Sequence, residues 1–170
     1  MNKILGIDPL KKIIFGITAF VLLFWQLNTG AANATALREV DRTVKLNDIE
    51  TVLLSDQQVA KGERVFIDTC SSCHNSGRTK NNPNVNLSLD DLEGAEPARD
   101  NILAMVDYLK NPTSYDGEVD LSQLHPNVTR ADLWAGMRNY NDEDLQNVSG
   151  YVLVQAQVRG EAWGGGKTVN

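Results

Sequence analysis

The sequence predicts an all-α fold of four or five short helices, preceded by a short extended arm or hairpin. The prediction depends on apolar residues at helical spacing and on capping and stop residues at the ends of the helical segments. Those residues are Ser55 with Gln58, Asn141 with the acidic residues after it, and Asn111-Pro112. Residues 35–54 alternate weakly between apolar and polar, which favours an arm or hairpin rather than a helix.

A signal segment is predicted before this domain. Lys3, Lys11 and Lys12 precede an uncharged apolar stretch over residues 13–27, which is short for a membrane span of roughly 20 residues. Ala32-Asn33-Ala34 has the small-x-small pattern of a signal peptidase site, so we predict cleavage after it. One domain over residues 35–170 would then work beyond a membrane, in a lumen or periplasm. An uncleaved anchor helix is the alternative.

The predicted mature domain is acidic. The chain has 170 residues with 16 Lys+Arg and 22 Asp+Glu; 13 basic and 21 acidic groups follow residue 34, a formal charge of −8. Proteins that bind nucleic acid neutralise phosphates with an excess of Lys and Arg, so this composition excludes that class. The length suits a single domain with one core.

Five consecutive residues, Cys70-Ser71-Ser72-Cys73-His74, contain both cysteines of the chain and one of its two histidines. C-x-x-C-H is the attachment signature of a c-type haem. Two thiols on one helical turn can reach the two vinyl groups of a porphyrin edge, and the next histidine can ligate the iron. We therefore predict one covalently bound haem c, with Cys70 and Cys73 as thioether attachments and His74 as the proximal iron ligand. The helices are expected to surround it.

Three other interpretations of this motif fit the sequence less well. A thioredoxin-like redox pair requires a βαβ context, and nothing around Cys70 is typical of a strand. A zinc site requires four donors, and the adjacent Cys73 and His74 could hardly share one tetrahedral ion. A short-loop disulfide would leave the histidine without a role.

The second axial ligand has three candidates: His125, Met105 and Met137. Met105 lies at core spacing within a predicted helix, which favours packing. Met137 follows a short helical pattern that begins at Thr129 and could face the haem as packing or as a ligand. His125 precedes a proline, which predicts extended backbone in a loop. We prefer His125 as the distal ligand. Two imidazoles favour ferric iron, so we predict a low reduction potential.

These residues resemble class I cytochromes c, and more closely the cytochrome c-550 family, the extrinsic haem subunits of photosystem II in cyanobacteria and some algae. The resemblance extends over nearly all of residues 35–170. Besides the haem motif it depends on segments in family order: Phe66-Ile67-Asp68-Thr69-Cys70, Ala95-Glu96-Pro97, Arg99-Asp100-Asn101, Leu109-Lys110-Asn111-Pro112, Ser114-Tyr115-Asp116-Gly117-Glu118, Leu124-His125-Pro126, Met137-Arg138-Asn139-Tyr140 and Trp163-Gly164-Gly165.

The resemblance implies a class I cytochrome c fold and one haem ligated by His74 and His125. It also implies a peripheral place on the lumenal side of the thylakoid membrane, with photosystem II lumenal subunits and other extrinsic subunits of the oxygen-evolving complex as partners. There such a subunit stabilises the manganese-calcium cluster and helps retain calcium and chloride; it is an electron-transfer type protein, not an enzyme. The tail, residues 167–170, departs from the family's aromatic end.

A soluble electron-transfer cytochrome c of the lumen or periplasm is the alternative function. The acidic body offers no obvious ring of lysines for steering to an acidic redox partner, which favours the docked subunit. Peroxidase-like chemistry requires an open iron site, which two imidazoles would close.

Overall fold

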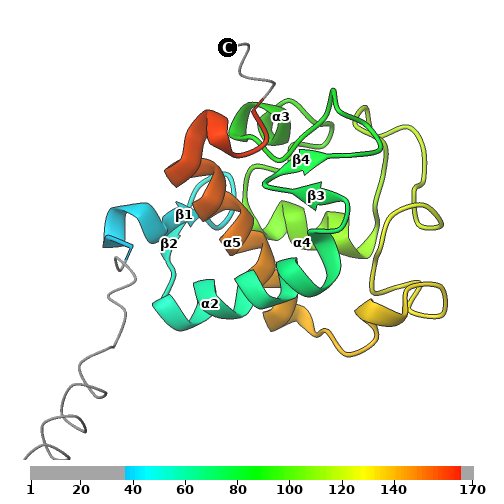
Figure 1. Cartoon of the computed structure of the whole chain (residues 1–170), viewed down its shortest axis with the longest axis horizontal. Coiled ribbons are helices and arrows are strands. Elements are labelled where there is room, and N and C mark those ends of the chain that lie inside the picture. The colour runs from blue at the N-terminus through cyan, green and yellow to red at the C-terminus, as the bar shows by residue number, and fades with distance from the viewer. Residues whose placement is uncertain (1–36, 166–170) are drawn as a thin grey trace, which may run out of the picture. The chain divides into compact units, whose positions relative to one another are not determined.

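The computed structural model describes residues 37–165 (Figure 1). The predicted signal segment, residues 1–34, and the tail at 167–170 lie outside this range. Four α-helices, two short hairpins and several single helical turns make up the described chain. In order they are a 3-10 turn Glu39–Arg42, β1 Thr43–Lys45, β2 Thr51–Leu53, α2 Asp56–Val65, a π-helix Phe66–Cys70, β3 His74–Asn75, β4 Arg78–Thr79, α3 Leu89–Glu93, α4 Ile102–Lys110, a 3-10 turn Ala135–Met137, α5 Asp142–Arg159 and a 3-10 turn Gly160–Ala162.

The N-terminal hairpin confirms the expected alternation in residues 35–54. Strands β1 and β2 pair antiparallel, with Val44 opposite Val52. Val44 is buried in the core whereas Lys45 points to solvent, as the period of two in a strand requires.

The start signals of the two main helices function as predicted. Ser55 caps α2 by accepting from the Gln58 N–H while the Gln58 side chain accepts from the Ser55 N–H. Asn141 and Asp144 form the same reciprocal pair at α5. Asn101 caps α4, which ends at Lys110 before Asn111-Pro112. These caps fix where each helix begins, and hence which face it turns inward.

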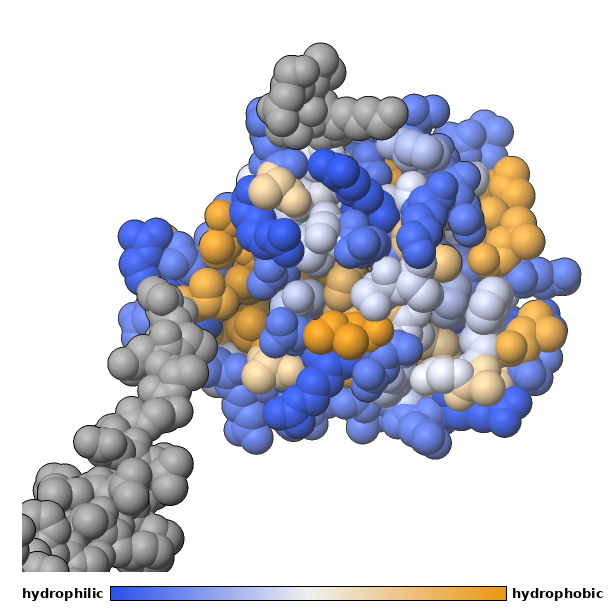
Figure 2. Space-filling view, in the orientation of Figure 1, coloured by the Kyte–Doolittle hydropathy of each residue, from blue (hydrophilic) through white to orange (hydrophobic). Residues whose placement is uncertain are grey.

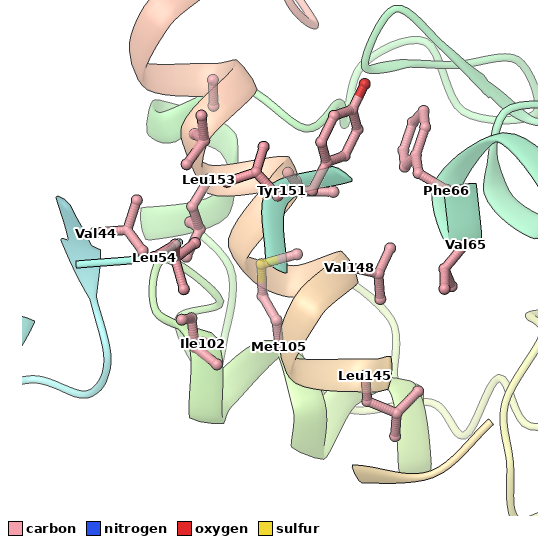
Figure 3. Close-up of a cluster of buried hydrophobic side chains, with 14 of the residues drawn as sticks. Val44, Leu54, Val65, Phe66, Ile102, Met105, Leu145, Val148, Tyr151 and Leu153 are labelled. Carbon is pink, nitrogen blue, oxygen red and sulfur yellow. The ribbon is translucent and has the colours of Figure 1, made fainter. Parts of the chain in front are cut away.

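Helices α2 and α5 cross at very close range. A Cβ on Gly62 would lie 2.0 Å from the Asn147 carbonyl oxygen, so only glycine allows this approach. Next to the crossing, the rings of Phe66 and Tyr151 pack at 5.4 Å with a tilt of 48° (Figure 3). Gly150 of α5 is not part of this contact, because its missing Cβ leaves room for Leu54 instead.

The rest of the core gathers on the same two helices. Figure 3 shows Val65 on the side of Val148, and the β1 side chain Val44 beside Leu54. Helix α4 adds Ile102 and Met105, both buried. The core is thus built mainly from α2, α4 and α5.

The stretch 75–96 is rich in polar residues, yet it contains regular structure. It contains the rest of the β3–β4 hairpin and helix α3, capped by Ser88. The helical pattern expected from Thr129 yields only turns and the 3-10 turn at Ala135–Met137. In residues 75–96, local turn residues provide structure that hydrophobic periodicity does not reveal.

Candidate functional site

The two cysteines lie where α2 ends. The helix continues as a π-helix whose last residue is Cys70, and one more turn, closed by Cys73 N–H donating to the Cys70 carbonyl at 3.1 Å, brings the second thiol into place. Widened π-turns of this kind are frequent at functional sites. Cys70 is partly buried, Cys73 is exposed, and they are not joined in a disulfide. The sulfurs are therefore available for another bond.

The chemistry of Cys70 argues against a redox pair. Burial raises the pKa of its thiol to about 12, and the neighbouring Cys73 adds to the effect. Catalytic cysteines in redox motifs have lowered pKa values because the thiolate is the nucleophile. Among residues 37–165, no group of three or more His, Cys, Asp or Glu side chains is placed to hold a metal ion by itself. Both observations disfavour the redox and zinc interpretations of the motif.

The structure brings together the two histidines that were predicted to share a metal. His74 begins β3 immediately after the cysteines, and His125 lies in the loop between α4 and the 3-10 turn at Ala135–Met137. Their ring centroids are 6.2 Å apart and their planes differ by 55°. Residues from distant parts of the sequence thus present two imidazoles to one gap.

Each imidazole is held through its Nδ1 atom. His125 Nδ1 lies 2.9 Å from the carbonyl oxygen of Pro126, to which it donates, and His74 Nδ1 lies 3.1 Å from the hydroxyl oxygen of Thr79. When Nδ1 carries the proton, the lone pair is on Nε2, the other nitrogen of the ring. This is the tautomer required of a histidine that binds metal through Nε2.

Burial keeps both rings neutral. It lowers the pKa of His74, and it lowers the pKa of His125 to about 4, with the proximity of His74 as the next cause. A neutral imidazole is the form that ligates a metal.

The gap between the histidines fits an iron atom. Two metal–nitrogen bonds of about 2 Å each, together with the half-widths of two imidazole rings, give a centroid separation of about 6 Å. The observed value is 6.2 Å. The donor set of two thiols three residues apart and two neighbouring imidazoles is also that of a c-type haem, so the residues present fit this group.

The two methionine candidates are both buried in the hydrophobic core. Met105 packs in the cluster drawn in Figure 3, as its spacing predicted. Met137 is 4 % exposed, and it is His125 that faces His74.

Two further residues support His125, and neither was predicted in this role. Tyr108 in α4 meets the imidazole edge-on, with ring centroids 4.9 Å apart. The buried guanidinium of Arg99 lies 4.1 Å above the Tyr108 ring and donates to the main-chain oxygens of Thr113 and Ser114. The packing of Tyr108 against the imidazole, with Arg99 on Tyr108, fixes the plane of the His125 ring. The helical position of Tyr108, one turn before the stop signal, does not reveal this role.

The comparisons with known proteins decide the family. The model of the cytochrome c-550 domain matches residues 35–170. The chain belongs to the cytochrome c-550 family. Photosystem II extrinsic protein V of Picosynechococcus sp. is 86 % identical over the full length of both chains. The protein of the same name from Synechocystis sp. is 47 % identical over 92 % of this chain and 98 % of that one.

The solved structures agree. The crystal structure of cytochrome c549 superposes with a TM-score of 0.73 at 49 % identity, and the match covers 75 % of this chain and 99 % of that chain. The predicted all-α, class I cytochrome c fold with a short N-terminal hairpin is confirmed. A cytochrome of this family carries haem, so the predicted cofactor, a covalently bound haem c, is confirmed as well.

Proposed function

We propose that this cytochrome c-550 holds one haem c by thioether bonds to Cys70 and Cys73, with His74 and His125 as its two axial iron ligands. The distance of 6.2 Å between the ring centroids of the two histidines carries this assignment. When bound, the haem supplies one-electron redox chemistry. The protein's part is to hold each Nδ1 proton, on Pro126 O and Thr79 Oγ1, so that each Nε2 keeps its lone pair for the metal.

A low reduction potential follows from this ligand pair. Imidazole is a stronger donor to ferric iron than a thioether is, and methionine ligation raises the potential of cytochromes c. A haem held by both His74 and His125 would leave the iron no open position for peroxide or other exogenous ligands. This favours electron storage or a structural role over catalysis on a substrate.

Replacing His125 by methionine tests the assignment. We expect a positive shift in potential of about 0.1 V or more, within the ~0.8 V over which axial ligands move haem potentials. The oxidised variant should gain the near-infrared band of methionine-to-iron charge transfer. Redox titration and absorption spectroscopy measure both effects.

Met137→Leu is the matched control, because Met137 is the methionine that could face the haem as packing or as a ligand. It should leave potential and spectrum unchanged. A near-infrared methionine band in the wild-type protein, lost in Met137→Leu, would contradict ligation by His125.

We further propose that the protein is an extrinsic subunit of photosystem II, peripheral on the lumenal side of the thylakoid membrane. Relatives at 86 % and 47 % identity are named photosystem II extrinsic protein V. None of the helices over residues 37–165 has the length and apolar character needed to span a membrane. The signal segment predicted at residues 1–34 supports the lumenal side, and the family match begins at residue 35. In this place the subunit stabilises the manganese-calcium cluster and helps retain calcium and chloride.

Washing oxygen-evolving membranes with high salt or alkaline buffer tests the docked role. We expect release of this protein with loss of most oxygen evolution, restored by adding back the purified protein. Calcium and chloride should partly replace it. A protein found free in the lumen, whose removal leaves oxygen evolution unchanged, would instead be a soluble electron carrier.

A further inference from the structure

The two histidines are anchored by different kinds of group. His125 donates to Pro126 O, an atom of the main chain that every residue type provides. His74 contacts Thr79 Oγ1 at 3.1 Å, a side-chain atom that only a hydroxyl residue provides. The proximal side therefore depends on the identity of one residue, and the distal side does not.

The contact is built by the β3–β4 hairpin. His74 and Thr79 are directly opposite each other in the antiparallel pair, so their side chains share one face. Ser76 and Gly77, both with positive φ (53° and 78°), form the two-residue turn between the strands. The Lys80 N–H donates to the Cys73 carbonyl at 2.9 Å and extends the pairing back to the haem motif.

The hairpin is in turn braced from outside. Thr79 N–H donates to Asn86 Oδ1 at 2.9 Å, and Asn86 N–H donates to Asp91 Oδ2, in the first turn of α3, at 3.0 Å. On the other side Gly77 packs against the buried ring of Trp163, where a Cβ would come within 2.8 Å. Thr79 is therefore held in place independently of the contact with His74.

We propose that Thr79 is a positioning residue for the haem iron: its hydroxyl oxygen accepts the Nδ1 proton of His74 and so fixes the tautomer and plane of the proximal ligand. This proposal rests on the ligand role of His74 proposed above. With Nε2 on the metal, Nδ1 of a neutral imidazole carries the proton and must be the donor. A hydrogen bond donated from Nδ1 makes the ligand more basic. A more basic ligand favours ferric iron, so Thr79 contributes to the low potential.

Thr79→Val removes the hydroxyl and keeps the shape. We expect the ferrous-to-ferric ratio at a fixed ambient potential to rise by up to about tenfold, a positive shift of up to about 59 mV for one electron. The low-spin ferric electron-paramagnetic spectrum should also change, since its g-values depend on the angle between the ligand planes. Thr79→Ser retains the hydroxyl and should restore both values.

Thr43→Val is the matched control. Thr43 also lies in a short hairpin, in β1, and its hydroxyl donates to Glu39 O at 2.8 Å. Losing that bond should leave the potential and the spectrum unchanged. Equal shifts in Thr43→Val and Thr79→Val, or none in Thr79→Val, would overturn the proposal.

A measurement on the wild-type protein covers the case in which Thr79→Val does not fold. In the diamagnetic ferrous protein, nitrogen-15 spectra should show a slowly exchanging Nδ1 proton on His74 with a nuclear Overhauser contact to Thr79. A rapidly exchanging proton without that contact would overturn the proposal. Failure of the ligand assignment itself is distinguishable, because the wild-type ferric spectrum would then lack bis-histidine g-values.

Discussion

A chain in which Cys70 and Cys73 are both replaced by serine is expected to lose all covalently bound haem. Thioether bonds survive denaturation, whereas axial coordination by histidine does not outlast unfolding. After denaturing electrophoresis the double variant should show no haem stain, and its extract should show none of the thioether-shifted pyridine haemochrome spectrum. A haem bound between the two imidazoles stabilises the folded state. The double variant holds its haem less firmly, so we also expect it to be much less stable than the wild type.

Single serine variants at either position provide the control. Each retains one cysteine and should retain haem through one thioether bond, with a haemochrome band between those of haem c and unattached haem. If the double variant still carries haem after denaturation, the attachment assigned to the motif is wrong.

The second large effect is expected at the crossing of α2 and α5. Gly62→Ala places a Cβ 2.0 Å from the carbonyl oxygen and 2.6 Å from the carbonyl carbon of Asn147. These are backbone atoms of a buried helix and cannot rotate away, so the helices must separate. Overpacking of a core costs about 1–3 kcal/mol and occasionally more. We expect a loss at the upper end, about 3 kcal/mol of unfolding free energy, measured by denaturant titration of the haem protein.

Gly136→Ala is the control with the same chemical change. Its added Cβ would meet only the Thr69 side chain, at 3.9 and 4.0 Å, and Gly136 does not need a positive φ. We expect the unfolding free energy to change by at most about 0.5 to 1 kcal/mol. It should rise slightly, because alanine restricts the unfolded chain. Equal losses in the two variants would show that the close crossing is not what Gly62 provides.

Features set by short-range chemistry were predictable from the sequence. The capping boxes at Ser55 and Asn141 indicate where helices begin, because their side chains satisfy N–H groups of the first turn. The haem motif was recognisable because two thiols and an imidazole must reach one porphyrin from a few residues. His125 could be selected as the facing residue since no other histidine was available after His74.

Most other features set by tertiary contacts were not predictable. The contact of Thr79 with His74 depends on a two-residue turn in which Ser76 adopts a positive φ, an unusual conformation for serine. Tyr108 supports His125 only because α4 passes behind the loop that carries the histidine. Gly150 lies in the same helix as Asn147 but accommodates Leu54 rather than α2, because the rotation of α5, which periodicity leaves open, directs it there.

The last described residues of the chain pack against the π-helix and the β3–β4 turn, which lie on either side of the haem motif in the sequence. Trp163 is 1 % exposed and packs on Phe66 at 5.3 Å, and Gly164 N–H donates to the Ser76 carbonyl at 2.9 Å. A chain synthesised only as far as the two cysteines therefore lacks the residues that complete the packing around the β3–β4 hairpin. Thioether bonds to the two cysteines would not depend on that packing, because both thiols precede it in the chain.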